Sequence, residues 1–222
     1  MEDLKDRKSQ ENSVITSVRR ALGREAGLPL APRPLILPPR DPADPAAELV
    51  LLLAEIEALS GETRRIDAGS IGESLAELVH SKQIASAACW RTPWLDALCI
   101  EERLAALGVE LLSPHSAPEE LARCDLGVTG VDYALPETGT LALVSSPEKP
   151  RAVSLLPRVH LALLDPAALR ADMHQVFAEA KGQPYLVFIT GPSRTADIEL
   201  TVTLGVHGPR QLVVWAVVTR VG

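Results

Sequence analysis

The stretch Leu212-Val213-Val214-Trp215-Ala216-Val217-Val218 decides the class of fold that this chain adopts. All of its residues are apolar, and Tyr185 to Ile189 forms a second continuous apolar run. A strand that lacks polar alternation is typical of a parallel sheet whose two faces are both covered by helices. We therefore expect both runs to be strands that are buried on two sides.

The segments that precede these strands alternate between helical and extended patterns. Apolar spacing predicts helices near residues 49–59, 71–79 and 97–107, and extended runs predict strands near 63–67, 84–89 and 109–112. Ser70 with Glu73, and Ser116 with Glu119, have the spacing of capping boxes that open helices. Such alternation indicates an α/β fold with a mixed, mainly parallel sheet flanked by helices.

Residues 126–164 have a different, mostly extended pattern. Leu141 to Val144 and Val159 to Leu164 are apolar runs, and turn-forming residues separate them, which predicts a hairpin-like insertion in the sheet. Asp165-Pro166 then has the signature of a helix start, with aspartate at the N-cap and proline at the first position. The buried face of that helix is expected to consist of Leu169, Met173, Val176 and Phe177.

The N-terminal part of the chain has a separate organisation. Helical spacing of apolar residues predicts a short helix over residues 11–23, which Gly23 ends. Seven prolines follow between Pro29 and Pro45, and a segment this rich in proline is a stiff arm or linker rather than a helix. We therefore divide the chain into an N-terminal helix with a proline-rich arm, residues 1–45, and an α/β domain, residues 46–222.

Composition and charge exclude several classes of function. The chain has 222 residues and a formal net charge of −7, which argues against nucleic acid or an anionic membrane surface as a partner. No apolar run reaches the roughly 20 residues that a membrane span needs. The N-terminus is a charged stretch without a signal-peptide core, so we expect a cytoplasmic protein.

The cysteines and histidines give no metal-binding pattern. Cys89, Cys99 and Cys124 are too far apart in the sequence for a zinc motif, and their odd number does not form a disulfide framework. A [4Fe–4S] cluster usually takes four thiolates. We therefore expect this chain to bind no cofactor and no metal by itself.

A first candidate site follows the apolar run that ends at Ile189. Thr190-Gly191-Pro192-Ser193-Arg194-Thr195 leads into a stretch compatible with a helix, and ligands of α/β sheets bind where strands end and helices begin. Gly191 would allow close backbone approach, Ser193 and Thr195 would add hydroxyl donors, and Arg194 would hold a carboxylate or phosphate. The alternative is a helix N-cap beside a surface arginine, and spacing alone favours neither.

Residues on both sides of this segment extend the hypothesis. Asp197 would orient Arg194 through an ion pair, or it would only complement a helix dipole. His207 lies between glycines in Gly205-Val206-His207-Gly208-Pro209, which makes it a candidate catalytic residue. His160 begins an apolar strand, and a lone histidine there is more often a hydrogen-bonded core residue than a catalyst.

A second candidate site is the segment Gly130-Val131-Asp132-Tyr133-Ala134-Leu135-Pro136-Glu137-Thr138-Gly139-Thr140. A turn here needs Gly139 for a positive φ angle, but it does not need Glu137. Glu137 is therefore a candidate base or nucleophile, and Asp132, Thr138 and Gly139 are candidate ligand-binding residues. The alternative for Glu137 and Asp132 is that both are ordinary polar turn residues.

These two segments, together with Ser154-Leu155-Leu156-Pro157-Arg158-Val159-His160, resemble the LUD domain of lactate-utilization proteins, and most closely its small C-type subunit. The resemblance covers roughly residues 50–220 and implies a NagB/RpiA/CoA-transferase-like fold. Similar proteins serve with two partner subunits, one of which carries iron–sulfur clusters, in the oxidation of L-lactate to pyruvate.

The resemblance implies a non-redox subunit of a multi-subunit L-lactate oxidation system. The iron–sulfur cluster would then lie on a partner subunit, and this chain would supply a small-anion site around Arg194 for a carboxylate or phosphate. A homo-oligomer is compatible with this role. The alternative is a stand-alone enzyme, similar to CoA transferases or sugar-phosphate isomerases, that acts on a carboxylate, a CoA ester or a phosphorylated substrate through Glu137 and His207.

Overall fold

We analysed a computed structural model of the chain, which describes residues 14–23, 40–196, 202–204 and 208–218. The chain divides into two compact units, residues 1–38 and 39–222. In the first unit, residues 14–21 form the short helix that the sequence predicts, and Gly23 follows it with a φ of +63°. The apolar side chains of this helix are exposed.

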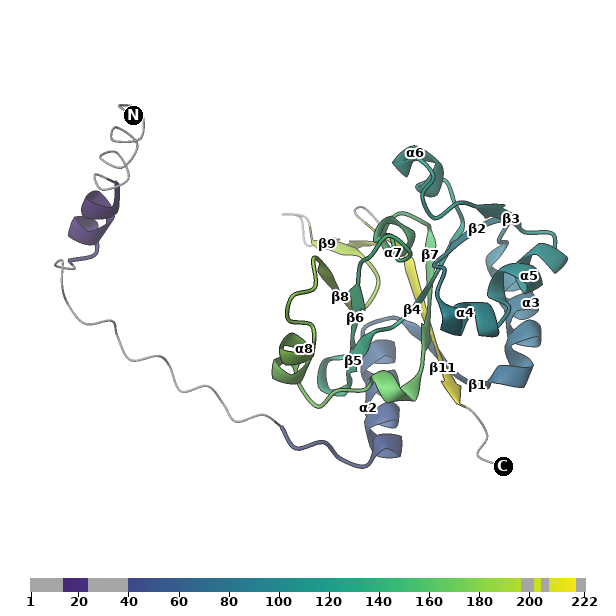
Figure 1. Cartoon of the computed structure of the whole chain (residues 1–222), viewed down its shortest axis with the longest axis horizontal. Coiled ribbons are helices and arrows are strands. Elements are labelled where there is room, and N and C mark those ends of the chain that lie inside the picture. The colour runs from purple at the N-terminus through teal and green to yellow at the C-terminus, as the bar shows by residue number, and fades with distance from the viewer. Residues whose placement is uncertain (1–13, 24–39, 197–201, 205–207, 219–222) are drawn as a thin grey trace. The chain divides into compact units, whose positions relative to one another are not determined.

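The second unit is built around a six-stranded sheet in the order β1-β11-β7-β4-β2-β3, and all of its strand pairs are parallel (Figure 1). Its strands are β1 (Glu62–Asp67), β2 (Ser86–Cys89), β3 (Glu110–Leu112), β4 (Leu126–Gly130), β7 (Val159–Leu164) and β11 (Gln211–Val218). The apolar run that ends at Val218 lies inside this sheet and is buried, as predicted.

The two faces of this sheet belong to two different apolar clusters. Along β11, Val213 and Trp215 point into one cluster, whereas Leu212 and Val214 point into the other. This alternation follows from the two-residue period of a strand. The continuous apolar character of β11 therefore fits its place in a sheet that is covered on both sides.

Helices cover the two faces unequally (Figure 1). The elements that contribute most to one face are α3 (Ile71–Lys82), α4 (Pro93–Ala97) and α5 (Ile100–Ala106). The other face is covered by α2 (Pro45–Ala58), whose Leu52 and Ile56 are fully buried. Asp44 begins α2 by accepting hydrogen bonds from the backbone N–H groups of Ala46 and Ala47. Short helices, α6 (Pro118–Leu121) and α7 (Ala152–Leu155), lie near the amino ends of the strands.

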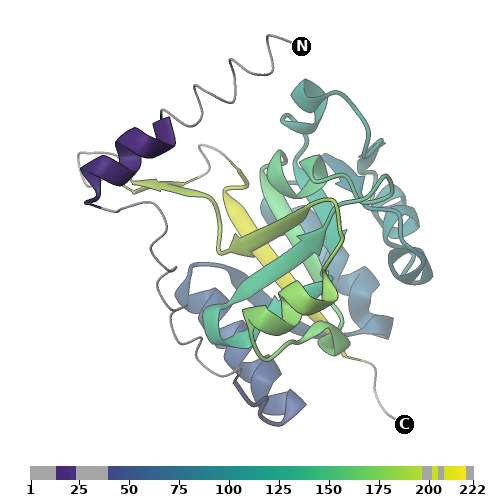
Figure 2. The same cartoon turned by 60° about the vertical axis from the view of Figure 1, so that its left-hand side comes forward.

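A small antiparallel sheet lies on the same face as α2, with α8 (Met173–Glu179) outermost (Figure 2). It consists of β5 (Tyr133–Leu135), β6 (Thr140–Val144) and β8 (Leu186–Thr190) in that order. The predicted insertion between the parallel strands is thus a hairpin that starts a sheet of its own. The predicted fold class, an α/β fold with a mainly parallel sheet flanked by helices, is confirmed.

The expectation that Tyr185 to Ile189 is covered on both faces is wrong. This run forms β8, which is the antiparallel edge strand of the small sheet and is only half-buried. Its apolar residues have separate partners: Phe188 packs edge-on against Phe177 at 5.8 Å, and the Arg151 guanidinium lies 4.5 Å from the Tyr185 ring. Apolar content alone does not distinguish such a strand from a central one.

The prediction that a helix begins at Asp165 is also wrong. Asp165 caps only a 3₁₀ turn, η3 (Pro166–Ala168), because the next residues extend beside β5, where the Arg170 N–H donates to the Ala134 carbonyl. The helix begins later, as α8, with Asp172 as its N-cap. Val176 is buried, but Met173 and Phe177 are exposed.

Three smaller predictions about helices are corrected by the structure. The helix expected over residues 97–107 is divided into α4 and α5 at Cys99, whose φ is +52°. The Ser70 side chain makes no capping bond to α3, and Ala117 rather than Ser116 begins α6. The stretch after Thr190 continues into strand β9 (Arg194–Ala196), which pairs with β10 (Val202–Leu204), and not into a helix.

Candidate functional site

A cavity of about 300 Å³ lies where β8 passes the amino ends of β7 and β11. We call it the His160 pocket. It is lined by Ser154, Leu155, His160, residues 187–194, Gly208, Pro209 and Leu212. Its volume is at the lower end of the roughly 300–1,000 Å³ that is typical of small-molecule sites. The pocket therefore has room for a small ligand.

His160 reaches this pocket because of strand alternation. Along β7, Leu161 and Leu163 point into the cluster on the α3 side, so His160 points to the opposite face, where the small sheet lies. Thr129 on β4 has the same orientation and is fully buried. The two side chains meet there, with 2.8 Å between Thr129 Oγ1 and His160 Nε2.

The second ring nitrogen of His160, Nδ1, makes no hydrogen bond in this arrangement. The side chain is 1% exposed, and Nδ1 has no hydrogen-bond partner in the described part of the chain. Burial lowers the pKa of His160 to about 4, so the imidazole is neutral near pH 7. The pocket is thus lined in part by a neutral imidazole whose Nδ1 is buried.

The loop that follows β8 forms another part of the pocket wall. Gly191 has a φ of +80°, and a Cβ there would lie 3.0 Å from the Leu59 carbonyl oxygen, so glycine is required. The Ser193 N–H donates to the Pro209 carbonyl, which joins this loop to the segment before β11. Residues 189–194 of this motif therefore lie together with Gly208 and Pro209 around one cavity.

Arg194 is the cation of the pocket. Its side chain is exposed, and among the described residues no carboxylate forms an ion pair with it. Because β9 follows instead of a helix, no helix dipole adds to its charge. The guanidinium of Arg194 is therefore the charged group that lines this cavity among the described residues.

The Glu137 segment folds against α2 and does not line this pocket. Gly139 has a φ of +59°, and a Cβ there would lie 2.9 Å from backbone atoms of Glu55 and Ile56. Thr138 Oγ1 donates to Thr140 Oγ1 at 2.8 Å. Gly139 and Thr138 thus hold a turn, η2 (Pro136–Thr138), close to the helix.

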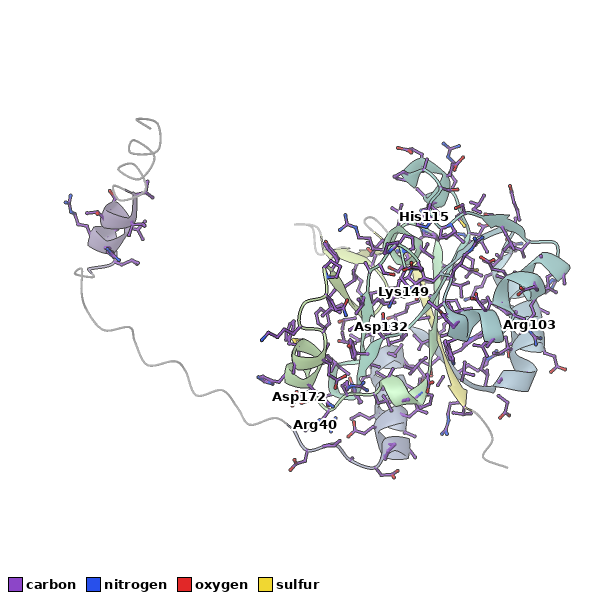
Figure 3. The ribbon with its side chains drawn as sticks, viewed as in Figure 1. Arg40, Arg103, His115, Asp132, Lys149 and Asp172 are labelled. Carbon is purple, nitrogen blue, oxygen red and sulfur yellow. The ribbon has the colours of Figure 1, made fainter. Side chains whose placement is uncertain are left out.

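The two carboxylates of this segment have different neighbours. Asp132 accepts from the Val144 N–H at 2.8 Å and from Lys149 Nζ at 2.6 Å, and Figure 3 shows Asp132 and Lys149 beside each other. Glu137 is exposed, and its Oε2 lies 3.9 Å from Arg40 Nε. The structure therefore places Asp132 in a bridge that joins the end of β6 to Lys149, and it places Glu137 at the surface.

The remaining predicted site residues are only partly described. Thr195 lies in β9, where its backbone pairs with Thr203. Asp197 and His207 lie outside the described residues. The sequence analysis interpreted His160 as a core residue; it is buried and hydrogen-bonded, as expected, but it also lines the pocket. The spacing of the predicted elements gave no signal that β8 would leave a cavity at that position.

The thiols and other metal-ligating side chains are dispersed. Cys89 and Cys124 are buried, and burial raises the pKa of each thiol, whereas Cys99 is exposed. Across residues 14–23, 40–196, 202–204 and 208–218, no group of three or more His, Cys, Asp or Glu side chains is arranged to hold a metal ion. No helix in this part of the chain is long and apolar enough to cross a membrane.

The LUD domain model matches residues 44–217, and the chain therefore belongs to the LUD-domain family. Among its relatives is the lactate utilization protein C of Shouchella clausii, which is 31% identical over 173 residues, or 73% of this chain and 76% of the relative.

Other relatives match over shorter parts. The lactate utilization protein C of Halalkalibacterium halodurans is 38% identical over 54% of this chain and 57% of its own length. An uncharacterized protein of Neisseria meningitidis serogroup B is 44% identical over 45% of each chain. The crystal structure of a DUF162 family protein from Deinococcus radiodurans matches 80% of this chain and 100% of its own, with a TM-score of 0.59 and 21% identity. That likeness concerns the fold.

Proposed function

We propose that this chain acts in lactate utilization as a non-redox subunit of a multi-subunit system that oxidises L-lactate to pyruvate. Relatives named lactate utilization protein C, one of them aligned over 73% of this chain, support the role in lactate utilization. In this proposal the chain is cytoplasmic, and the iron–sulfur cluster belongs to a partner subunit. This chain contributes a binding site for a small anion.

The observation that carries the anion site is the position of Arg194 at the His160 pocket. The guanidinium is exposed at a cavity that is otherwise lined largely by apolar and small residues, and it has no carboxylate partner in the described part of the chain. A guanidinium presents a planar fork of N–H donors that matches a carboxylate or phosphate. Lactate and pyruvate are carboxylates of a size that the cavity accepts.

Growth on L-lactate tests the role directly. Deletion of the gene in its own cells should abolish growth on L-lactate and leave growth on pyruvate unchanged, and the wild-type gene should restore growth. The Arg194→Ala variant should restore it poorly. The control is Arg65→Ala, since Arg65 is an exposed arginine on β1 away from the pocket. Normal growth of the deletion strain on L-lactate would contradict the proposal.

A second experiment tests the subunit role. The tagged wild-type chain, purified gently from cells grown on L-lactate, should carry an iron-containing partner and reduce a dye when L-lactate is added. The isolated chain should do neither. Dye reduction by the purified chain alone would favour an enzyme that works without partners, and a chain that is purified without iron or activity would contradict a stable complex.

A further inference from the structure

Three arginines precede three neighbouring strands of the parallel sheet. Arg158 and Arg210 come directly before β7 and β11, and Arg123 comes three residues before β4. These strands are adjacent in the order β11-β7-β4, and adjacent strands lie about 4.8 Å apart. The three arginines and Asp125 line one cavity of about 300 Å³, which we call the arginine pocket. Parallel pairing thus brings together positive charges that are far apart in the sequence.

Backbone hydrogen bonds fix the positions of these residues. The Arg210 N–H donates to the Arg158 carbonyl at 2.9 Å, and the Arg158 N–H donates to the Cys124 carbonyl at 3.2 Å. Both bonds join residues that precede neighbouring strands of the sheet. A site that is attached to a sheet in this way is held in place before a ligand arrives.

One carboxylate lines the pocket, and its oxygens are already in use. Asp125 Oδ1 accepts from Nη2 of Arg158 at 3.1 Å, and its Oδ2 accepts from the backbone N–H groups of Ala85 and Ser86. The same nitrogen of Arg158 also donates to the Lys82 carbonyl at 2.9 Å. Asp125 therefore orients one guanidinium, whose other N–H groups stay available.

The other two arginines of the pocket are exposed. In the part of the chain that the structure describes, Arg123 and Arg210 form no ion pair and no side-chain hydrogen bond. The lining thus has three positive charges and one negative charge. Like charges on neighbouring strands repel each other, and acidic residues outnumber basic ones by 29 to 22 in this chain. An anion that binds in the pocket would relieve this repulsion.

The charge of the lining favours a dianion over a monocarboxylate. A phosphate ester carries between −1.5 and −2 charges near pH 7, and its three terminal oxygens each accept hydrogen bonds. Guanidinium groups match these oxygens with paired N–H donors. A monocarboxylate has one charge and two oxygens, so it would leave part of the repulsion in place.

We propose that the arginine pocket binds the phosphate dianion of a small molecule, either inorganic phosphate or a small phosphate ester. Arg123 and Arg210 contact the phosphate oxygens, and Arg158 is held by Asp125 so that it presents its remaining donors. The site is distinct from the carboxylate site proposed at Arg194, because Arg194 lines a different cavity. The concave shape of the pocket favours a small molecule as the ligand.

Calorimetric titration of the purified full-length chain with inorganic phosphate, glycerol 3-phosphate and acetate tests the proposal. We expect the wild type to bind phosphate at least tenfold more tightly than acetate. Arg123→Gln and Arg210→Gln should each weaken phosphate binding about tenfold, as the loss of one charge-assisted hydrogen bond implies. Because both side chains are exposed and make no side-chain contact of this kind, neither variant should impair folding.

The control is Arg65→Gln, which removes the same charge from an exposed position on β1 and should leave phosphate affinity unchanged. Absence of phosphate binding, equal affinity for phosphate and acetate, or the same loss in Arg65→Gln as in the pocket variants would overturn the proposal. Tighter binding of glycerol 3-phosphate than of phosphate would identify an ester as the ligand. The reverse order would identify inorganic phosphate, and either order supports the site.

Arg194→Gln separates this inference from the proposed function. This variant should bind phosphate like the wild type and should bind L-lactate more weakly. Phosphate binding that depends on Arg194 and not on Arg123 or Arg210 would place phosphate in the His160 pocket and would overturn the inference. If the wild type binds phosphate through Arg123 and Arg210 but does not bind L-lactate, the inference stands and the carboxylate site of the proposed function fails.

Discussion

The hydroxyl oxygens of Thr140 and Thr190 lie 2.8 Å apart, and this contact joins the two glycine-containing segments that are separate in the sequence. Both segments also rest on the end of α2: Gly139 lies against Glu55 and Ile56, and Gly191 lies against Leu59. One helix thus serves as the platform for both turns. The wall of the His160 pocket is therefore joined to the turn that contains Glu137 by the contact between Thr140 and Thr190 and by the shared packing on α2.

This connection predicts the effect of removing one hydroxyl. Thr140 is 4% exposed and bonds to both Thr138 and Thr190, so Thr140→Val deletes the central member of a chain of hydroxyls. We expect the free energy of unfolding to fall by about 1 kcal/mol, since the two remaining hydroxyls are exposed and can bind water. Urea unfolding measures this change. Thr138→Val is the control and should have a smaller effect.

The close approach of Gly139 to α2 predicts a larger loss. In Gly139→Ala, the new Cβ would meet the helix backbone at 2.9 Å in addition to straining a positive φ. We expect a loss of stability of roughly 2–4 kcal/mol. Gly108 also has a positive φ, but no atom lies within 4 Å of its would-be Cβ. Gly108→Ala should therefore show only the strain, about 1 kcal/mol, and equal losses in both variants would contradict this interpretation.

The sequence was sufficient to predict the parallel sheet because a two-sided core leaves a continuous apolar run. Residues 212–218 show this most clearly, and their neighbours β7 and β1 were predicted nearly to their ends. The same rule failed at residues 185–189. The apolar side chains of β8 are only half-buried, and they pack in pairwise contacts such as that of Phe188 with Phe177. Local composition does not report which tertiary partner a strand has.

The sequence placed some of the cavity-lining residues together, but their role in ligand binding stays a prediction. Gly191, Ser193 and Arg194 do line one cavity, which their mixture of small, hydroxyl and charged residues suggested. His160 was missed as a pocket residue because its contribution depends on the register between β7, β4 and the small sheet, and register is a non-local property. Glu137 was predicted as a site residue from its residue type alone, whereas its position at the surface is set by the turn on which it lies.

The start of the domain offers a prediction about a buried ion pair. Arg40 binds both carboxylate oxygens of Glu48 at 2.8 and 2.6 Å, and Glu48 is 4% exposed. The guanidinium lowers the pKa of that carboxyl and thereby keeps it ionised. Arg40→Met would leave Glu48 buried without a cation. We expect a loss of about 2 kcal/mol, below the value for fully buried pairs because Arg40 remains partly exposed.

The Arg64–Glu77 pair provides the matched control for this prediction. It has a similar short contact, but both side chains are largely exposed, so its removal should have a much smaller effect on unfolding. The double variant Arg40→Met with Glu48→Met should recover part of the loss, because no uncompensated charge is then buried. Similar destabilisation by Arg40→Met and Arg64→Met would show that burial of the pair is unimportant.

The neutral state of His160 predicts how stability depends on pH. Burial lowers the pKa of the ring to about 4 in the folded chain, whereas an unfolded histidine titrates near pH 6.5. Between these values the unfolded chain binds the additional proton, so the free energy of unfolding decreases as the pH falls. The contribution of the neutral ring is complete above about pH 6.5 and is lost progressively towards pH 4.

Urea unfolding of the wild type and of His160→Phe, each near pH 7 and near pH 5, measures this dependence. The wild type should lose about 2 kcal/mol more than the variant over this interval, since each unit of pH below the unfolded pKa corresponds to about 1.4 kcal/mol. Contributions from the exposed histidines and from the carboxylates are common to both proteins and cancel. Equal losses, or a His160 ring resonance in the folded protein that titrates near pH 6.5, would show that the ring is accessible to protons and that the pocket does not hold it neutral.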